Sequence, residues 1–223
     1  TVGNLADFTS FSFHAVKNLT TAEGGCATWK HIDGIDDGEL YHLYQLYSLH
    51  GQSKDALAKT KAGAWEYDIV GPWYKCNMTD IMAAIGLVQL KRYPSLIQRR
   101  YEIVKKYDEA MDAMHIEHIQ HISDVYHSSA HLYMIRIPDI SVEQRNEIIT
   151  RMAENGVATN VHYKPLPMMS GYKAFGWDIK DFPNAYRLYH NEITLPLHTL
   201  LSDEDVEIVV QTLRNTLEEM KLL

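Results

Sequence analysis

The stretch DFTSFSFHAVKNLTTAEGG, residues 7–25, most constrains how this chain can fold. Its first seven residues alternate aromatic or small side chains with polar ones, which predicts a strand, and GGCATWK predicts a second strand after a turn. The adjacent glycines Gly24 and Gly25 allow the backbone to turn or to approach a neighbouring segment closely. The sequence therefore places a single lysine, Lys17, between two predicted strands.

Two residues near Lys17 carry groups that a lysine-bound cofactor needs. Ser12 lies five residues before Lys17, and His14 lies three before it. A serine hydroxyl can hydrogen-bond a cofactor phosphate and an imidazole can lie beside the reacting ring, while the lysine amine bonds the cofactor and moves a proton. A solvated surface lysine is the more common explanation of this spacing, so spacing alone leaves both interpretations open.

The composition limits the partners of the chain. Its 223 residues carry a formal net charge of −8, which argues against a surface that binds nucleic acid through lysine and arginine. No apolar run approaches the roughly 20 residues that span a bilayer, and no leader-like segment opens the sequence. We therefore expect a cytoplasmic globular protein with neither nucleic-acid nor membrane partners. The cysteines Cys26 and Cys76 match no disulfide or zinc motif and are expected to be buried.

The sequence pattern changes near Tyr93–Pro94, which predicts two domains, residues 1–93 and 94–223, with a hinge between them. In the first domain, DDGELYHLYQLYSLHG predicts a helix that ends at Gly51. The irregular stretch 51–74 is long for a connection within a compact domain, so we expect a lid or an interface loop there.

The next segment is strongly apolar. Thr79 and Asp80 offer an N-cap and a first-turn acid for IMAAIGLVQL, a helix that is apolar nearly all round and is expected to be buried. Pro94 is expected to interrupt it, and SLIQRRYEIVKKYDEAM restarts it with one apolar face. Beyond this point strands and helices alternate, which predicts a small α+β domain. The predicted strands are AHLYMIRI, ATNVHY and EITLPL, and the predicted helices are SVEQRNEIITRMAENG, ending at Gly156, DFPNAYRLYHN and SDEDVEIVVQTLRNTLEEM.

The stretch FSFHAVKNLTTAEGG resembles the lysine motif of the DegT-type (DegT/DnrJ/StrS) sugar aminotransferases, which bind pyridoxal 5'-phosphate (PLP) in the aspartate aminotransferase fold. The resemblance implies an α/β fold, the C-terminal part of a fold type I PLP enzyme. Residues 1–93 would form the end of the large PLP-binding domain, and residues 94–223 the small α+β domain with its bridging helix. Five further blocks follow in the order that the family uses: LHG (49–51), YKCNMTDIMAAIGLVQL (74–90), SSAHLYMIRI (128–137), NGVATNVHYKPL (155–166) and ITLPLHTLLSDEDVEIVV (193–210).

The resemblance implies transfer of an amino group from glutamate to the keto group of a nucleotide-linked sugar, for cell-surface polysaccharides such as lipopolysaccharide or for antibiotic sugars. Lys17 matches the lysine that bonds the cofactor and moves the proton, and Ser12 matches the serine that binds the cofactor phosphate. Asn77 matches an asparagine that reaches the phosphate of the neighbouring subunit, which implies a homodimer with shared active sites. His162 and Tyr163 match a pair that contacts substrate, although a satisfied strand end explains that pair equally well.

The sequence departs from the family pattern ahead of Lys17. Family members carry there the phosphate-binding Gly-Thr amides, the aromatic residue that stacks on the ring and the acid that pairs with the pyridine nitrogen. We therefore expect a fragment, from a split or truncated gene, from proteolysis or from cloning, that is inactive alone. A second polypeptide that supplies the missing N-terminal half would restore activity.

Three alternatives compete with the transaminase. Related PLP-dependent sugar dehydratases carry histidine where this sequence has Lys17, which favours the transaminase. A non-catalytic dimerisation or scaffolding remnant would keep the fold without binding the cofactor. The spacing of His115, His118 and His121 could gather a metal ion, but the interleaved isoleucines have the same spacing, so packing explains the pattern and we expect no metal.

Overall fold

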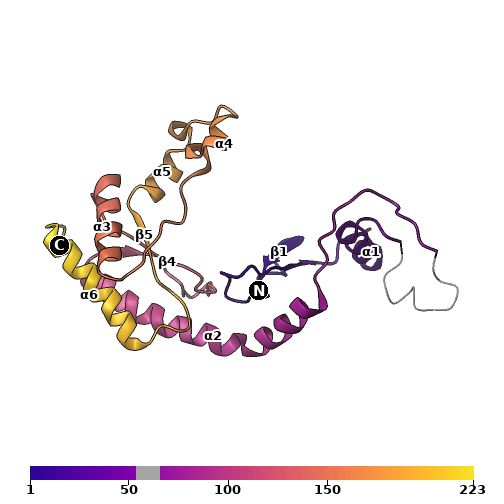
Figure 1. The fold of residues 1–223 in the computed structure, drawn as a ribbon, viewed down its shortest axis with the longest axis horizontal. Coiled ribbons are helices and arrows are strands. Elements are labelled where there is room, and N and C mark those ends of the chain that lie inside the picture. The colour runs from indigo at the N-terminus through magenta and orange to yellow at the C-terminus, as the bar shows by residue number, and fades with distance from the viewer. Residues whose placement is uncertain (54–65) are drawn as a thin grey trace. The chain divides into compact units, whose positions relative to one another are not determined.

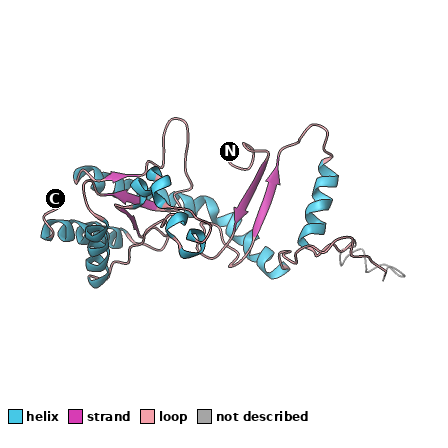
Figure 2. Ribbon diagram, turned by 90° about the horizontal axis from the view of Figure 1, so that it is seen from above, coloured by secondary structure: helices cyan, strands magenta, loops and turns pink. Residues whose placement is uncertain are grey.

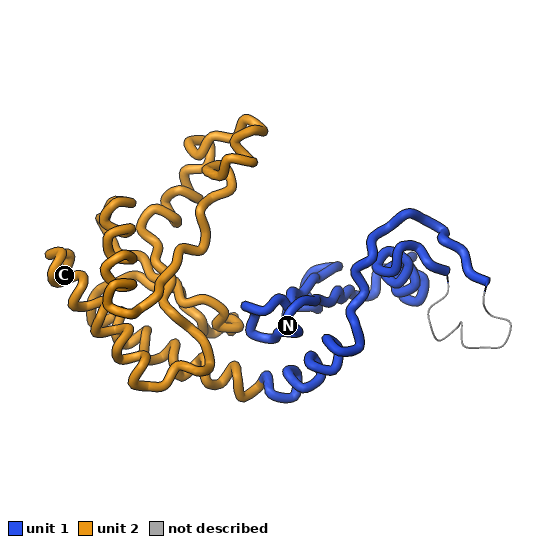
Figure 3. The backbone as a smooth tube through the Cα atoms, viewed as in Figure 1, with its two compact units in different colours: residues 1–93 blue, residues 94–223 orange. Residues whose placement is uncertain are grey.

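The computed structural model describes residues 1–53 and 66–223 (Figure 1). The chain divides into two compact units, residues 1–93 and 94–223 (Figure 3), and the division falls at Tyr93–Pro94, where the sequence pattern changes. Among the described residues, no helix is both long and apolar enough to span a bilayer.

The first unit begins with a two-stranded antiparallel sheet. Strands β1 (Phe8–Ser12) and β2 (Gly25–Trp29) pair from Phe8 opposite Trp29 to Ser12 opposite Gly25 (Figure 2). A Cβ atom on Gly25 would lie 2.6 Å from the carbonyl oxygen of Phe11, so only glycine allows this close pairing. Both predicted strands are confirmed. The expected burial of the cysteines is wrong, because Cys26 on the open face of β2 and Cys76 are both exposed.

Helix α1 (Asp37–Ser48) confirms the predicted helix but not its predicted end. The Asp36 side chain accepts a hydrogen bond from the Glu39 N–H at 2.8 Å and caps the first turn. The helix stops at its C-cap, Leu49, before Gly51. Gly51 has a φ of +78°, and a Cβ atom there would lie 2.0 Å from the carbonyl oxygen of Gly71, so this glycine serves a close backbone contact.

The predicted lid or interface loop, residues 51–74, falls partly on residues 54–65, which lie outside the described residues. On either side of that range, Gln52 and Ile69 form an isolated antiparallel bridge. The Ser53 main-chain N–H donates to the carbonyl oxygen of Asp68 at 2.9 Å. The role predicted for this segment therefore stays a prediction.

Helix α2 (Asp80–Ala113) runs through Pro94 without a break, so the predicted interruption is wrong. Proline removes one main-chain donor from a helix. Because Pro94 is exposed, water can hydrate the carbonyl oxygen that loses its donor. The predicted start is confirmed, with the Thr79 hydroxyl accepting from the Met82 N–H at 3.3 Å.

The expected burial of IMAAIGLVQL in α2 is wrong. Ile81, Leu87 and Leu90 are 77%, 65% and 60% exposed. The described residues of the first unit leave these side chains largely uncovered. Thr21 does approach the helix, since its Cγ2 lies 3.0 Å from where a Cβ on Gly86 would be. An apolar sequence is buried only where another element covers it.

The second unit is the predicted α+β domain, a three-stranded antiparallel sheet packed on helices. The strand order is β3 (Glu117–His118), β4 (Tyr133–Arg136) and β5 (Glu192–Leu195), with Tyr133 opposite Leu195. Helix α3 (Val142–Glu154) packs against α6 (Asp203–Glu219) and β5. Fully buried side chains from α2, the sheet and the two helices form one core, among them Tyr107, Met111, Tyr133, Ile135, Ile148, Ile193 and Leu213.

Local signals in the sequence set the ends of the helices. Ser141 and Gln144 form a capping box at α3, and Gly156 follows its end at a φ of +82°, as predicted. Ser202 caps α6 with Asp205 in the same way. The remaining short helices are η2 (Leu166–Met168), α4 (Ser170–Lys173), η3 (Ile179–Asp181) and α5 (Pro183–Tyr189), the last of which confirms the predicted helix in DFPNAYRLYHN.

The strand predicted in ATNVHY is wrong. Only Asn160 pairs, as an isolated bridge with Thr194. The Val161 N–H donates to the Asn160 side chain at 2.8 Å, and the His162 N–H donates to the Glu192 carboxylate at 2.9 Å. Because these two main-chain N–H groups donate to side chains, they are not available for hydrogen bonds with the main chain of β5.

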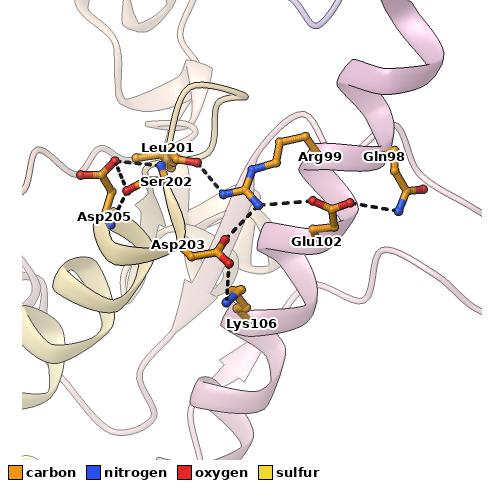
Figure 4. Close-up of polar contacts among 8 residues, drawn as sticks. All are labelled: Gln98, Arg99, Glu102, Lys106, Leu201, Ser202, Asp203 and Asp205. Atoms are coloured by element: carbon orange, nitrogen blue, oxygen red, sulfur yellow. Dashed lines mark hydrogen bonds and ion pairs between the residues drawn. The ribbon is translucent and has the colours of Figure 1, made fainter.

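An ion-pair network joins α2 to the start of α6 within the second unit (Figure 4). Nη1 of Arg99 lies 2.9 Å from Asp203, while Nη2 donates to the carbonyl oxygen of Leu201 at 2.6 Å. Lys106 lies 3.1 Å from the other oxygen of Asp203. The network holds the first turn of α6 against α2.

Candidate functional site

Lys17 lies in the loop that joins β1 to β2, and hydrogen bonds close the base of that loop. The Phe13 N–H donates to the carbonyl oxygen of Gly24 at 2.8 Å, and the Phe13 carbonyl oxygen accepts from the Thr21 N–H at 2.9 Å. Within the loop, the Lys17 N–H donates to the His14 carbonyl oxygen at 2.9 Å. Lys17 is thus half-buried on backbone that is fixed at both ends.

The structure brings three predicted residues, Ser12, His14 and Lys17, into this one hairpin. The Ser12 side chain is exposed, and its hydroxyl oxygen accepts from the His14 main-chain N–H at 3.3 Å. Nε2 of His14 lies 3.5 Å from the Glu23 carboxylate, with both side chains exposed. A hydroxyl, an imidazole and an amine are therefore available to a ligand at the loop.

The residues at the C-terminal end of the loop pack tightly. A Cβ atom on Gly24 would lie 2.5 Å from Oγ1 of Thr21 and 2.8 Å from Cε of Met78, and the φ of Gly24 is +149°. Thr21 is buried and donates to the Glu23 carbonyl oxygen at 2.7 Å. This packing explains why the sequence has glycine here, and it holds the loop in one conformation.

Asn77 lies next to Met78, the residue that packs at Gly24, and precedes α2 by three positions. Its side chain is exposed and accepts a hydrogen bond from Nζ of Lys75. The structure thus places Asn77 in the same unit as the lysine loop, with its amide open to a ligand.

In the second unit, His162 is held by two residues of β5. Its main-chain N–H donates to Oε2 of Glu192 at 2.9 Å, and its Nδ1 lies 2.9 Å from Oγ1 of Thr194. The Thr194 hydroxyl donates to Oε1 of Glu192. The ring of Tyr163 lies edge-on to that of His162 at 4.5 Å, and Tyr163 is 66% exposed.

Burial shifts the pKa values of His162 and Glu192. It lowers the pKa of His162 below the ordinary histidine value. It raises the pKa of Glu192, against the opposing effects of the hydrogen bonds from Thr194 and the His162 N–H and of the nearby charge of Arg145. Burial therefore favours the neutral form of the imidazole and opposes the ionised form of the carboxyl group.

Both residues line a cavity of about 290 Å³, whose wall is formed by Glu117, His118, Ile119, Met134, Arg136, His162, Leu188 and Glu192. The sequence predicts His162 as a site residue, but the prediction does not include Glu192 and Thr194. The alternation in EITLPL contained the signal, because a period of two puts both residues on one face of a strand.

Of the histidines at 115, 118 and 121, the first is exposed and the other two make local polar contacts. His118 lies in β3, where its Nδ1 is 3.1 Å from Asp108 and its Nε2 is 3.1 Å from Asp112. Nδ1 of His121 lies 2.6 Å from Oγ of Ser128. Across residues 1–53 and 66–223, no three histidine, cysteine or acidic side chains gather closely enough to hold a metal ion.

Solved structures with the same architecture define the class of protein. A putative sugar aminotransferase of Streptococcus pneumoniae in its PMP form matches with a TM-score of 0.94 at 57% identity, over 100% of this chain and 55% of that one. The same protein in its PLP form matches with a TM-score of 0.92. Helicobacter pylori PseC, an aminotransferase, matches with a TM-score of 0.81 at 30% identity, over 98% of this chain and 55% of that one. The fold is that of the PLP-dependent, fold type I sugar aminotransferases.

The chain belongs to the DegT/DnrJ/EryC1/StrS aminotransferase family, whose model matches residues 1–214. A spore coat polysaccharide biosynthesis protein of Bacillus subtilis is 37% identical over 218 residues, which are 96% of this chain and 54% of that protein. A UDP-4-amino-4,6-dideoxy-N-acetyl-beta-L-altrosamine transaminase of Campylobacter jejuni is 32% identical over 220 residues, 99% of this chain and 55% of that protein. The chain thus spans about half the length of these relatives.

The described residues of the lysine loop fit PLP, the cofactor of this family. The exposed Ser12 has a hydroxyl that can donate to a phosphate oxygen, and the Lys17 amine can bond an aldehyde carbon. Both groups stand on the same closed hairpin, whose tight packing at Gly24 fixes it.

Proposed function

We propose that this chain supplies the cofactor lysine and part of the substrate site of a transaminase that moves an amino group from glutamate to the keto group of a nucleotide-linked sugar. The observation that carries the proposal is the position of Lys17, half-buried in a closed hairpin loop, in a chain that belongs to the aminotransferase family. The names of the relatives, which include a nucleotide-sugar transaminase, support the substrate class.

Lys17 has two roles in this proposal. Its amine would condense with the aldehyde of the cofactor, with loss of water. Once a substrate amine displaced it, the free Nζ would carry a proton between the substrate carbon and the cofactor. When bound, PLP supplies an electron-withdrawing ring that stabilises negative charge at the reacting carbon. A lysine on fixed backbone suits proton transfer, because the donor and acceptor atoms must stay within hydrogen-bond reach.

Ser12, His14 and Asn77 orient the cofactor. The Ser12 hydroxyl would donate to a phosphate oxygen, and His14, whose main-chain N–H bonds that hydroxyl, would lie beside the ring of the cofactor. The exposed Asn77 amide reaches the phosphate of the neighbouring subunit, so that each site of a homodimer is completed by its partner.

His162 and Tyr163 contact substrate. Support comes from the structure of the second unit, where His162 lines a cavity and the ring of Tyr163 is exposed beside it. The setting in this proposal is the biosynthesis of cell-surface polysaccharides in the cytoplasm; the name of the Bacillus subtilis relative, a spore coat polysaccharide biosynthesis protein, supports the polysaccharide pathway.

These residues by themselves do not complete a turnover in this proposal, since they correspond to 54% or 55% of the length of the relatives. The missing contributions are the phosphate-binding amides, the stacking aromatic and the acid at the pyridine nitrogen. A polypeptide equivalent to the N-terminal part of the relatives would supply them.

The glutamate half-reaction tests the function without knowledge of the sugar. The purified chain, PLP and glutamate are mixed with and without the N-terminal part of the Streptococcus pneumoniae relative, and 2-oxoglutarate is measured. We expect release only when both polypeptides are present, and none with Lys17→Ala. A stable complex that binds PLP and releases no 2-oxoglutarate would instead favour the non-catalytic remnant.

A further inference from the structure

The hydrogen bonds around His162 define which of its ring nitrogens carries the proton. We infer that Glu192, acting through Thr194, fixes His162 in the neutral form with the proton on Nδ1. Nε2 is then a hydrogen-bond acceptor, and the ligand group that it takes is a donor such as a sugar hydroxyl or an amine, not a phosphate or a carboxylate. The ligand assignment rests on the proposed function, whereas the proton assignment rests on the hydrogen-bond geometry with Glu192 ionised.

The Glu192 carboxylate determines the direction of the hydrogen bonds. Both oxygens of an ionised Glu192 can only accept hydrogen bonds, so the Thr194 hydroxyl must donate its proton to Oε1. A hydroxyl has a single proton. Its oxygen can therefore only accept at Nδ1 of His162, 2.9 Å away, and Nδ1 must carry a hydrogen.

Glu192 also fixes the backbone of His162. Its second oxygen, Oε2, accepts from the His162 main-chain N–H at 2.9 Å, so one carboxylate holds both the backbone and, through Thr194, the ring. Glu192 and Thr194 are only 4% and 5% exposed, so bulk water does not compete for these bonds. A guanidinium nitrogen of Arg145 donates to the Glu192 carbonyl oxygen at 3.2 Å and keeps a positive charge nearby.

Burial acts on the two groups in different ways. Burial lowers the pKa of His162, which favours the neutral ring. Burial raises the pKa of Glu192 and so opposes the ionised carboxylate, whereas the hydrogen bonds from Thr194 and the His162 N–H and the nearby charge of Arg145 favour it. The proton assignment is therefore made for about pH 8, well above the ordinary carboxyl range. A neutral ring with its proton on Nδ1 has a lone pair on Nε2, and a lone pair attracts donors and repels anions.

Histidine nitrogen NMR tests the proton assignment directly. The chain is labelled with ¹⁵N at histidine only, and the His162 signals among the twelve histidines are identified by their loss in His162→Gln. At about pH 8, well above the ordinary carboxyl range, we expect the Nδ1–H form in the wild type and in Thr194→Ser, which keeps the hydroxyl. Thr194→Val, which lacks the hydroxyl, is expected to lose this preference.

Glu192→Gln is expected to move the proton of His162 from Nδ1 to Nε2, which is the clearest outcome of the series. The side-chain oxygen of the glutamine would still accept the hydrogen bond from the His162 N–H. The side-chain nitrogen of the glutamine would then donate to Oγ1 of Thr194. The Thr194 hydroxyl would then donate to Nδ1, and the proton of His162 would move to Nε2. A merely structural role for Glu192 predicts no such inversion in a variant whose circular dichroism shows that it stays folded.

The result that would overturn the proton assignment is the Nε2–H form in the wild type, or the same form in the wild type and in Glu192→Gln. Inorganic phosphate serves as the probe for the ligand assignment, and we expect it to leave the His162 signals unchanged. A phosphate-dependent shift towards the doubly protonated ring would contradict that assignment. These signals need neither cofactor nor activity, so failure of the proposed function, seen as absent labelling of Lys17, is a separate result.

Discussion

Nη1 of Arg145 donates to the main-chain carbonyl oxygen of Tyr189 at 3.1 Å, and the guanidinium lies 4.8 Å from the centroid of the Tyr189 ring. The same guanidinium bonds the Glu192 carbonyl oxygen at 3.2 Å and the Asn146 side chain at 2.8 Å. Arg145 is only 2% exposed. It therefore joins α3 to the start of β5, the strand that carries Glu192 and Thr194.

Arg145→Met is expected to lower the free energy of unfolding of the second unit by about 2–4 kcal/mol, because it leaves buried carbonyl oxygens without donors. Arg151→Met is the control, since Arg151 lies on the same helix and its side chain is 38% exposed. Urea denaturation followed by circular dichroism measures both. Equal effects of the two substitutions would contradict the role assigned to Arg145.

The ion pairs at Asp203 are expected to depend on salt and on pH. Arg99 and Lys106 hold the pKa of Asp203 below its ordinary value, so their stabilisation is present above that value and is lost as the pH falls through the lowered pKa. Asp203→Asn should lower the melting temperature at neutral pH and low salt, and the loss should shrink in high salt or as the pH falls below about 4.

Glu204→Gln is the matched control for Asp203→Asn. It removes the same charge from the same first turn of α6 and leaves the contacts of Arg99 and Lys106 in place. If both substitutions lower the melting temperature equally, the helix dipole and not the ion pairs explains the effect.

His121 should make the stability fall in mild acid. Burial lowers the pKa of its ring, which is 3% exposed and bonded to Ser128. The unfolded state then binds more protons below about pH 6.5, so the free energy of unfolding decreases as the pH falls from there through the lowered pKa. His121→Gln should weaken this decrease, measured by urea denaturation at several pH values. A pH dependence that His121→Gln leaves unchanged would assign the effect to other groups.

The sequence predicts those parts of the fold that depend on local signals. The capping box of Ser141 and Gln144 and the glycine pair before β2 are examples, because a few neighbouring residues determine each of them. The continuation of α2 through Pro94 and the exposure of Ile81 depend on what surrounds the helix, which no local pattern contains.

The same distinction applies to the candidate site. Ser12, His14 and Lys17 lie on one hairpin, so their closeness in space follows from their spacing along the chain, whereas their roles at a cofactor stay a prediction. Glu192 and Thr194 are about 30 residues from His162, and only the folded second unit brings them together. Their pairing also explains why ATNVHY is not a strand.

Asn77 is predicted to act across the homodimer. Co-expression of Lys17→Ala and Asn77→Ala chains with different tags gives mixed dimers, in which the Asn77→Ala chain keeps Lys17 and its partner supplies an intact Asn77. After addition of PLP and borohydride, we expect more label on Lys17 in the mixed dimer than in the pure Asn77→Ala dimer. Equal labelling would show that Asn77 does not serve the partner's site.

The central claim is that Lys17 is the lysine that bonds PLP. The most direct measurement is the intact mass of the chain after addition of PLP and borohydride, followed by peptide mapping of the pyridoxyl group. Lys17→Arg keeps the charge without the amine, and Lys30→Arg is the matched control at another half-buried lysine beyond β2. We predict a single pyridoxyl group on Lys17, lost in Lys17→Arg and kept in Lys30→Arg. No label, or label spread equally over the other lysines in both variants, would contradict the claim.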